Sequence, residues 1–200
     1  MPLTAYGKNA ALTGATEKMK YVGLFSSAAY APTSETAING TKVNLTGAKG
    51  KGFVNGAIVV FRELTGGVTG LIAGRPYYVV GEETNAFEVA LEEGGAGVKV
   101  AAHALEAAGT KIALLTELSG GSYARVKAAW GAAKAGEIND TAAEAINVPA
   151  GKEVTDAGWW EGESTGKLVS TAKLENAEAY TGAGEYKVTS DKLEAAPTVA

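Results

Sequence analysis

Few side chains in this 200-residue sequence could carry out catalysis. His103 is its only histidine and it contains no cysteine, so a Ser-His-Asp triad has one possible base. A zinc site needs three or four converging ligands, which one histidine without cysteines cannot supply. His103 stands among small apolar residues, a context that predicts an ordinary half-buried or surface histidine. We therefore expect no catalytic residue and no metal site.

Pairs of carboxylates are the remaining candidates for acid–base chemistry, because glycoside hydrolases act through two such groups. Each pair lies beside Gly, Asn or Thr in a turn context, where solvated charges are the usual finding. The sequence thus predicts that the chain is not an enzyme. The pairs are Glu82 with Glu83, Glu92 with Glu93, and Glu161 with Glu163.

Two glycine-rich loops resemble ligand-binding loops only superficially. Residues 162–168 differ from a phosphate loop because three residues separate Gly162 from Gly166, and Leu168 stands where Ser or Thr should bind Mg²⁺. Residues 47–52 carry two lysines that could touch an acidic surface, but a flexible hairpin tip is the better interpretation. We expect no bound cofactor.

The aromatic pair Trp159–Trp160 follows Gly158 in a segment that reads as a strand. Neighbouring side chains of a strand point to opposite faces, so both rings cannot enter one core. One ring is expected in the core. The other is expected at a subunit interface, under a loop, or exposed as a platform for a sugar, with the interface favoured over the sugar.

Composition limits the partners. A net charge of −4 and scattered Lys and Arg residues disfavour nucleic acid as a partner. No apolar run approaches the ~20 residues needed to span a bilayer, and we expect neither a signal peptide nor a membrane segment. The lack of cysteine fits assembly in a reducing cytoplasm.

Short strands punctuated by 27 glycines predict a mainly β protein. A short helix is expected over residues 5–15, with Tyr6, Ala10 and Leu12 as its inward positions. In residues 86–91, alternation places Phe87, Val89 and Leu91 on one face. The expected strands are residues 20–26, 42–45, 57–62, 75–80, 86–91, 98–102, 111–115, 123–130, 145–148, 153–160, 167–172 and 185–189.

Several segments together resemble a family of tailed-bacteriophage virion proteins known as head decoration, minor tail or tail-fibre-like proteins. The intervening residues resemble a small β module inserted in other phage structural proteins, marked by residues 56–61, 64–67, 70–74, 77–80 and 84–87. The segments similar to the virion family are residues 21–27, 117–125 (Glu-Leu-Ser-Gly-Gly-Ser-Tyr-Ala-Arg), 148–151, 157–160 and 180–188.

The resemblance implies a β-sandwich built from the N-terminal strand and the C-terminal half, residues 1–35 with 110–200. It implies an inserted small β-barrel-like domain, residues 36–109, that projects from the particle. In the family the first strand reaches the 117–125 segment after a short loop, whereas about 80 residues intervene here. Tyr123, Arg125, Trp159 and Trp160 are the expected interface residues.

The function implied is a non-enzymatic component of the virion, assembled in the cytoplasm of the bacterial host. We expect a head decoration protein that binds the major capsid protein and other copies of itself, in a closed homo-oligomer such as a trimer. A minor tail or tail-fibre-associated protein contacting the host surface is the first alternative. A carbohydrate-binding module is the second.

Overall fold

A computed structural model of the chain describes residues 4–30, 36–39, 42–45, 47–64, 70–99, 103–105, 111–189 and 192–194, the side chains of 36–39, 103–105 and 192–194 excepted. One α-helix and a series of antiparallel strands make up this described part, so the prediction of a mainly β protein is confirmed. Residues 195–200 have little to pack, which predicts an arm or tail, and they lie outside the described residues.

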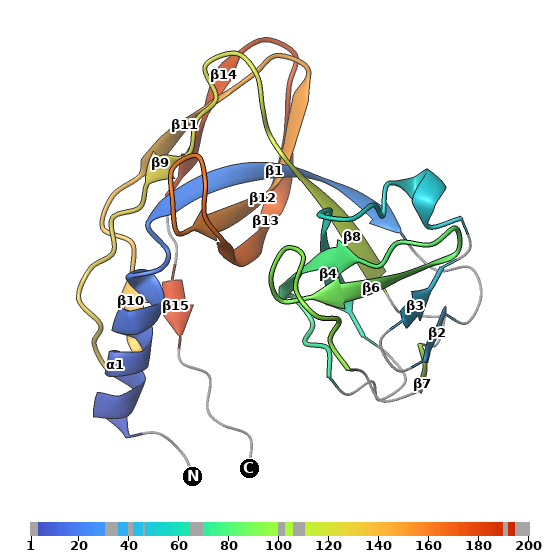
Figure 1. The fold of residues 1–200 in the computed structure, drawn as a ribbon. Coiled ribbons are helices and arrows are strands. Elements are labelled where there is room, and N and C mark those ends of the chain that lie inside the picture. The colour runs from blue at the N-terminus through green and yellow to red at the C-terminus, as the bar shows by residue number, and fades with distance from the viewer. Residues whose placement is uncertain are drawn as a thin grey trace. The chain divides into compact units, whose positions relative to one another are not determined.

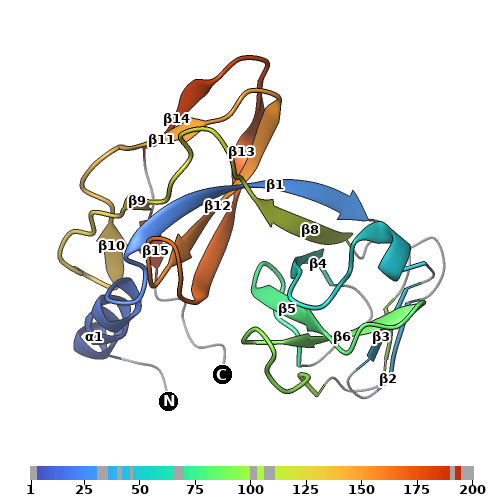
Figure 2. The same ribbon diagram turned by 45° about the horizontal axis from the view of Figure 1, so that its top comes forward.

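The chain divides into two compact units (Figures 1 and 2). Unit 1 consists of Met1–Leu24 and Leu118–Ala200, and unit 2 of Phe25–Glu117. The predicted division into a docking domain, residues 1–35 with 110–200, and an inserted domain, residues 36–109, stays a prediction.

Unit 2 is built from strands paired in the order β1-β8-β4-β5-β6-β3-β2-β7, all antiparallel, and the part of β1 that belongs to it begins at Phe25. Within the described residues no pairing joins β7 back to β1, so the ladder is open there. A short 3-10 helix, η1 (Lys49–Lys51), occupies the predicted hairpin tip. The strands are β1 (Tyr21–Tyr30), β2 (Thr36–Asn39), β3 (Lys42–Asn44), β4 (Ile58–Glu63), β5 (Pro76–Val80), β6 (Ala86–Ala90), β7 (His103–Leu105) and β8 (Lys111–Glu117).

Large aromatic side chains make the core of unit 2. Phe53 stacks on Phe87 with ring centroids 4.8 Å apart, and Phe61 meets Tyr77 edge-on at 6.0 Å. Alternation places Phe87 and Val89 inward, as predicted, but Leu91 is 47% exposed because β6 ends at Ala90. Residues 98 and 99 are not in a strand, and the rest of the strand predicted at 98–102 lies outside the described residues.

Unit 1 begins with the predicted helix, α1 (Ala5–Thr16), whose N-terminus is capped by the hydroxyl of Thr4 accepting from the Gly7 N–H at 3.2 Å. Of the three predicted inward residues only Leu12 is buried. Tyr6 is 84% exposed and Ala10 is also exposed, so those two predictions are wrong. Because glycines and small residues give this helix no broad apolar face, Leu12 is its one buried residue.

A long, bent ribbon of two paired strands forms most of unit 1, and its β12 part (Lys152–Trp160) also pairs with β1 on the other side. β12 pairs with β13 (Leu168–Tyr180), and β11 (Glu144–Val148) pairs with β14 (Gly184–Val188). The sequences Pro-Ala-Gly at residues 149–151 and Thr-Gly-Ala-Gly at residues 181–184 indicate hairpin or corner turns, and they are corners at which both strands of the ribbon bend from one pair into the next. The short strands are β9 (Val126–Lys127), which pairs with β1, and β10 (Glu137–Asn139), which pairs with β15 (Lys192–Glu194).

Both parts of the ribbon contribute to one core. Ile146 and Val148 of β11, Val154 and Trp159 of β12, and Leu24 of β1 are buried together in it. Residues 126–135, where the sequence would allow a helix in place of a strand, contain no helix. β9 is much shorter than the strand predicted at residues 123–130.

Candidate functional site

The segment that carries the family resemblance, residues 117–125, folds as a tight turn after β8. The Leu118 N–H donates to the Leu24 carbonyl at 2.9 Å, and the Tyr123 N–H donates to the Gly120 carbonyl at 3.2 Å. Gly120 and Gly121 have φ of 95° and 57°, a left-handed backbone that glycine adopts without strain. The Gly-Gly pair is therefore required by the turn itself.

Tyr123 fastens this turn to β1. Its hydroxyl accepts from the Leu24 N–H at 3.0 Å and lies 3.4 Å from the Leu24 carbonyl, to which it can donate. The side chain is half-buried. This predicted interface residue thus holds two segments of unit 1 together.

Arg125 lies over Trp160. The guanidinium carbon is 3.5 Å from the centroid of the indole ring, a close cation–π contact. The Nη1 group donates to the Gly162 carbonyl at 3.0 Å, which ties the guanidinium to the loop that joins β12 and β13. Of the four predicted interface residues, Arg125 and Trp160 are thus in direct contact.

Both tryptophans are buried within the chain, Trp159 to 4% and Trp160 to 6% exposure. Trp159 lies in the core of unit 1 beside Trp130, with ring centroids 6.3 Å apart, whereas Trp160 lies outside that cluster. Alternation along β12 therefore separates the rings as predicted. Of the three alternatives for the outward ring, exposure on the chain by itself is wrong, because Arg125 covers Trp160; a position at a subunit interface stays a prediction.

Glu144, which the sequence analysis did not single out, is one of two buried carboxyl groups of the ribbon; the other is Asp156 of β12, which accepts from the Thr155 hydroxyl at 2.8 Å. Glu144 is 4% exposed, and its Oε1 accepts from the Ala129 N–H at 3.0 Å. Burial raises the pKa of Glu144 from 4.5 to about 7, and the neighbouring Asp140 carboxylate adds to the increase. Glu144 stands at the first position of an alternation with Ile146 and Val148, and this pattern is the signal that could have predicted its burial.

Three of the six carboxylates weighed in the sequence analysis lie beside a donor or a cation. Glu82 accepts from the Asn55 N–H at 2.6 Å, Glu83 is in an ion pair with Lys42, and Glu161 lies 3.3 Å from Lys18. Among the described residues no three acidic or histidine side chains gather as a metal site would require. The side chain of His103 lies outside the described part, although its backbone opens β7.

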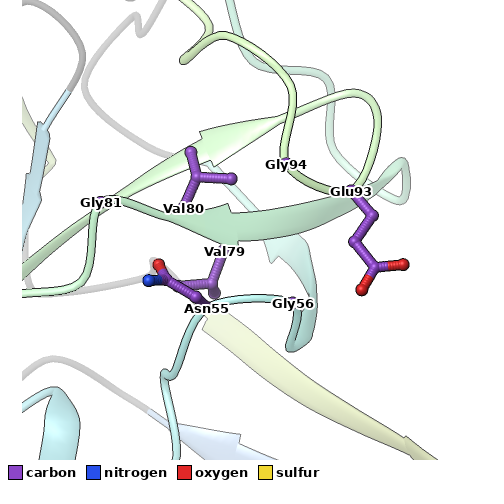
Figure 3. Close-up of a pocket in the computed structure, with 7 residues that line it drawn as sticks. All are labelled: Asn55, Gly56, Val79, Val80, Gly81, Glu93 and Gly94. Atoms are coloured by element: carbon purple, nitrogen blue, oxygen red, sulfur yellow. The ribbon is translucent and has the colours of Figure 1, made fainter.

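Unit 2 has an open depression of about 400 Å³ (Figure 3). No aromatic ring lines it, so a sugar would find no stacking surface there. The Glu93 side chain lines the depression, and one of its carboxylate oxygens lies 3.3 Å from the position that a Cβ on Gly56 would occupy. The lining residues are Asn55, Gly56, Val79, Val80, Gly81, Glu93 and Gly94.

None of the described helices has the length and apolar character to cross a membrane. No protein-family model matches the sequence, and no curated protein or solved structure is similar to the chain. The arguments for function therefore come from the residues, their geometry and the resemblance described above.

Proposed function

We propose that this chain is a non-enzymatic structural protein of a tailed-phage virion, in the first place a decoration protein that binds the major capsid protein of the head. The segments similar to the virion family carry the proposal. They contact one another in unit 1: Tyr123 bonds to Leu24 of β1, Arg125 covers Trp160, and the Gly151 N–H donates to the Tyr180 carbonyl at 2.7 Å. Motifs that hold each other in place are what a shared fold would preserve.

The architecture that we propose follows the same resemblance. Residues of unit 1 form a β-sandwich whose layers share the core around Trp159, and unit 2 is the inserted, barrel-like module that projects from the particle. Tyr123, Arg125, Trp159 and Trp160 would then support the docking surface from within, because each is buried or half-buried.

The proposed function depends on contacts made by the edges of strands. A protein that works through its edges needs no reactive side chain, since backbone N–H and C=O groups supply the contacts. The proposed partners are the capsid shell and further copies of the chain, in a closed oligomer such as a trimer, assembled in the bacterial cytoplasm. The burial of both indole rings argues against the alternative of a sugar-stacking module.

The proposal can be tested by mass spectrometry and electron microscopy of particles of a phage whose genome encodes this sequence. We expect hundreds of copies per particle, located on the head. A handful of copies at the tail would support the tail alternative instead. Complete absence of the chain from purified particles would refute a virion function.

A further inference from the structure

The ribbon of unit 1 exposes one edge of β14. β14 pairs with β11 over five residues, from Glu144 opposite Val188 to Val148 opposite Gly184. Among the described strands β11 is its only partner, and the two lie side by side in both views (Figures 1 and 2). The opposite edge of β14 can accept another strand, because an edge strand presents backbone donors and acceptors in a row.

The two faces of β14 differ sharply. Tyr186 is half-buried and Val188 is buried against the core of unit 1, whereas Glu185 and Lys187 are on the exposed face. The side chains of Lys187 and Glu185 are 62% and 49% exposed and form an ion pair of 3.6 Å. Opposite charges therefore lie two positions apart on one face, on either side of Tyr186.

This arrangement is self-complementary. In an antiparallel pair of two β14 strands related by a two-fold axis, either one residue faces its own copy or the axis passes between residues. When the axis passes between residues, each exposed residue of one strand is paired with a buried residue of the other. Such registers are disfavoured. Among registers in which one residue faces its own copy, centring on Glu185 or on Lys187 places like charges opposite each other.

Centring on Gly184 or on Val188, at the two ends of β14, would leave most of the strand unpaired, so the register centred on Tyr186 is favoured. It pairs all five residues of β14, with Gly184 opposite Val188. Glu185 of each copy faces Lys187 of the other, twice over, and directly opposed opposite charges stabilise a strand pair. The Glu185 carbonyl already accepts from the Tyr180 hydroxyl at 3.1 Å, and a carbonyl oxygen has a second lone pair for another donor.

We propose that the free edge of β14 pairs antiparallel with β14 of a second copy of this chain, about a two-fold axis at Tyr186. This proposal deepens the self-assembly included in the proposed function, and it names the surface. Because a two-fold edge contact closes on itself, it makes a dimer and is distinct from any three-fold contact.

A charge exchange between two variants tests the pairing. Glu185→Lys places lysines opposite each other at both contacts, and Lys187→Glu places glutamates there. We expect each variant alone to self-associate at least about tenfold more weakly than the unmodified chain in sedimentation equilibrium. In an equimolar mixture each lysine of one variant faces a glutamate of the other, so the association should recover to within about threefold of the original.

Matched controls separate this effect from net charge. Glu153→Lys and Lys152→Glu make the same charge changes at exposed positions of β12. We expect these controls to associate like the unmodified chain, alone and mixed. The ion pair between Glu185 and Lys187 within one chain is broken in both test variants, so recovery on mixing can come only from contacts between copies.

Three results would overturn the proposal: an unmodified chain that stays monomeric at its highest soluble concentration, test variants that associate normally, or a mixture that does not recover. These outcomes concern the purified protein alone. Presence in the particle is measured separately, so a failed edge contact would leave the virion function standing, and absence from particles would leave a measured dimer standing.

Discussion

The buried carboxyl of Glu144 makes the stability of unit 1 depend on pH. Its pKa is 4.5 in an unfolded chain and about 7 in the folded one, so the folded protein binds the proton more tightly. Stability from this group is therefore full below pH 4.5 and is lost as the pH rises through about 7. Since one pKa unit corresponds to ~1.4 kcal/mol and the pKa rises from 4.5 to about 7, the whole loss is at most about 3.5 kcal/mol.

Glu144→Gln tests this linkage. Glutamine keeps an oxygen that can accept from the Ala129 N–H but carries no charge at any pH. Urea denaturation of both proteins at about pH 5 and about pH 8 gives two differences in unfolding free energy. We expect the variant to gain up to about 3 kcal/mol relative to the unmodified chain on going from the lower to the higher pH.

Asp140→Asn separates the two causes of the shift. Asparagine keeps an acceptor for the Ala142 N–H but removes the charge that faces Glu144. Because burial is the larger cause, the carboxyl pKa measured by NMR should fall only part of the way toward 4.5. A Glu144 carboxyl that titrates near 4.5 in the folded protein, or equal pH dependence with and without Glu144→Gln, would refute the reasoning.

Three further predictions concern the turn and the hairpin loop, each measured as a change in unfolding free energy. Arg125→Ala should cost about 1 to 2 kcal/mol through the lost contact with Trp160, and Arg125→Lys should cost less. Equal effects of alanine and lysine would contradict a role for the cation. Tyr123→Phe should cost about 1 kcal/mol, because a part-buried backbone N–H loses its acceptor; no loss would mean that water replaces the hydroxyl. Gly162→Ala should cost more than about 1 kcal/mol, since its Cβ would lie 2.1 Å from a backbone carbonyl oxygen of the same loop. The matched change Gly182→Ala meets no atom within 4 Å and should stay within about 0.5 kcal/mol.

Apolar alternation predicted the strands that face a core. β4, β5 and β6 lie within a residue or two of their predicted bounds, because each buries large side chains that leave a pattern in the sequence. The same rule correctly assigned Trp159 and Trp160 to opposite faces of β12. Burial against the core is thus the part of the fold that the sequence records most directly.

Exposed edge strands and contacts between residues far apart in the chain leave no such pattern in the sequence. β13 runs to Tyr180, well beyond the predicted strand at residues 167–172, because its outer half is exposed and polar. That strand also contains an irregular register, where Val154 faces Glu178 but Asp156 faces Lys173. An exposed strand is held by backbone hydrogen bonds to its neighbour, and these do not depend on which side chains it carries.

The contact between Arg125 and Trp160 could not be predicted from the sequence either, because the two residues are 35 positions apart. Arg125 follows the turn at Gly120 and Gly121. A glycine pair indicates a turn but not where the turn delivers the next side chain. The contacts of Tyr123 and Arg125 within unit 1 could not be read from the sequence, and their place at an interface stays a prediction.

The ribbon formed by β11 and β14 carries both the proton-binding carboxyl and the proposed dimer contact, but on opposite faces. Glu144 is opposite Val188 on the buried face, whereas Glu185 and Lys187 are on the exposed one. Charging Glu144 at high pH would weaken the attachment of the ribbon to the core without changing the charges along its free edge. Dimer affinity should therefore follow the charge of residues 185 and 187, and unfolding free energy should follow the charge of Glu144. If Glu144→Gln altered dimer affinity as much as it altered stability, the two faces would not act independently, and the free edge of β14 would have to depend on how the ribbon packs against the core.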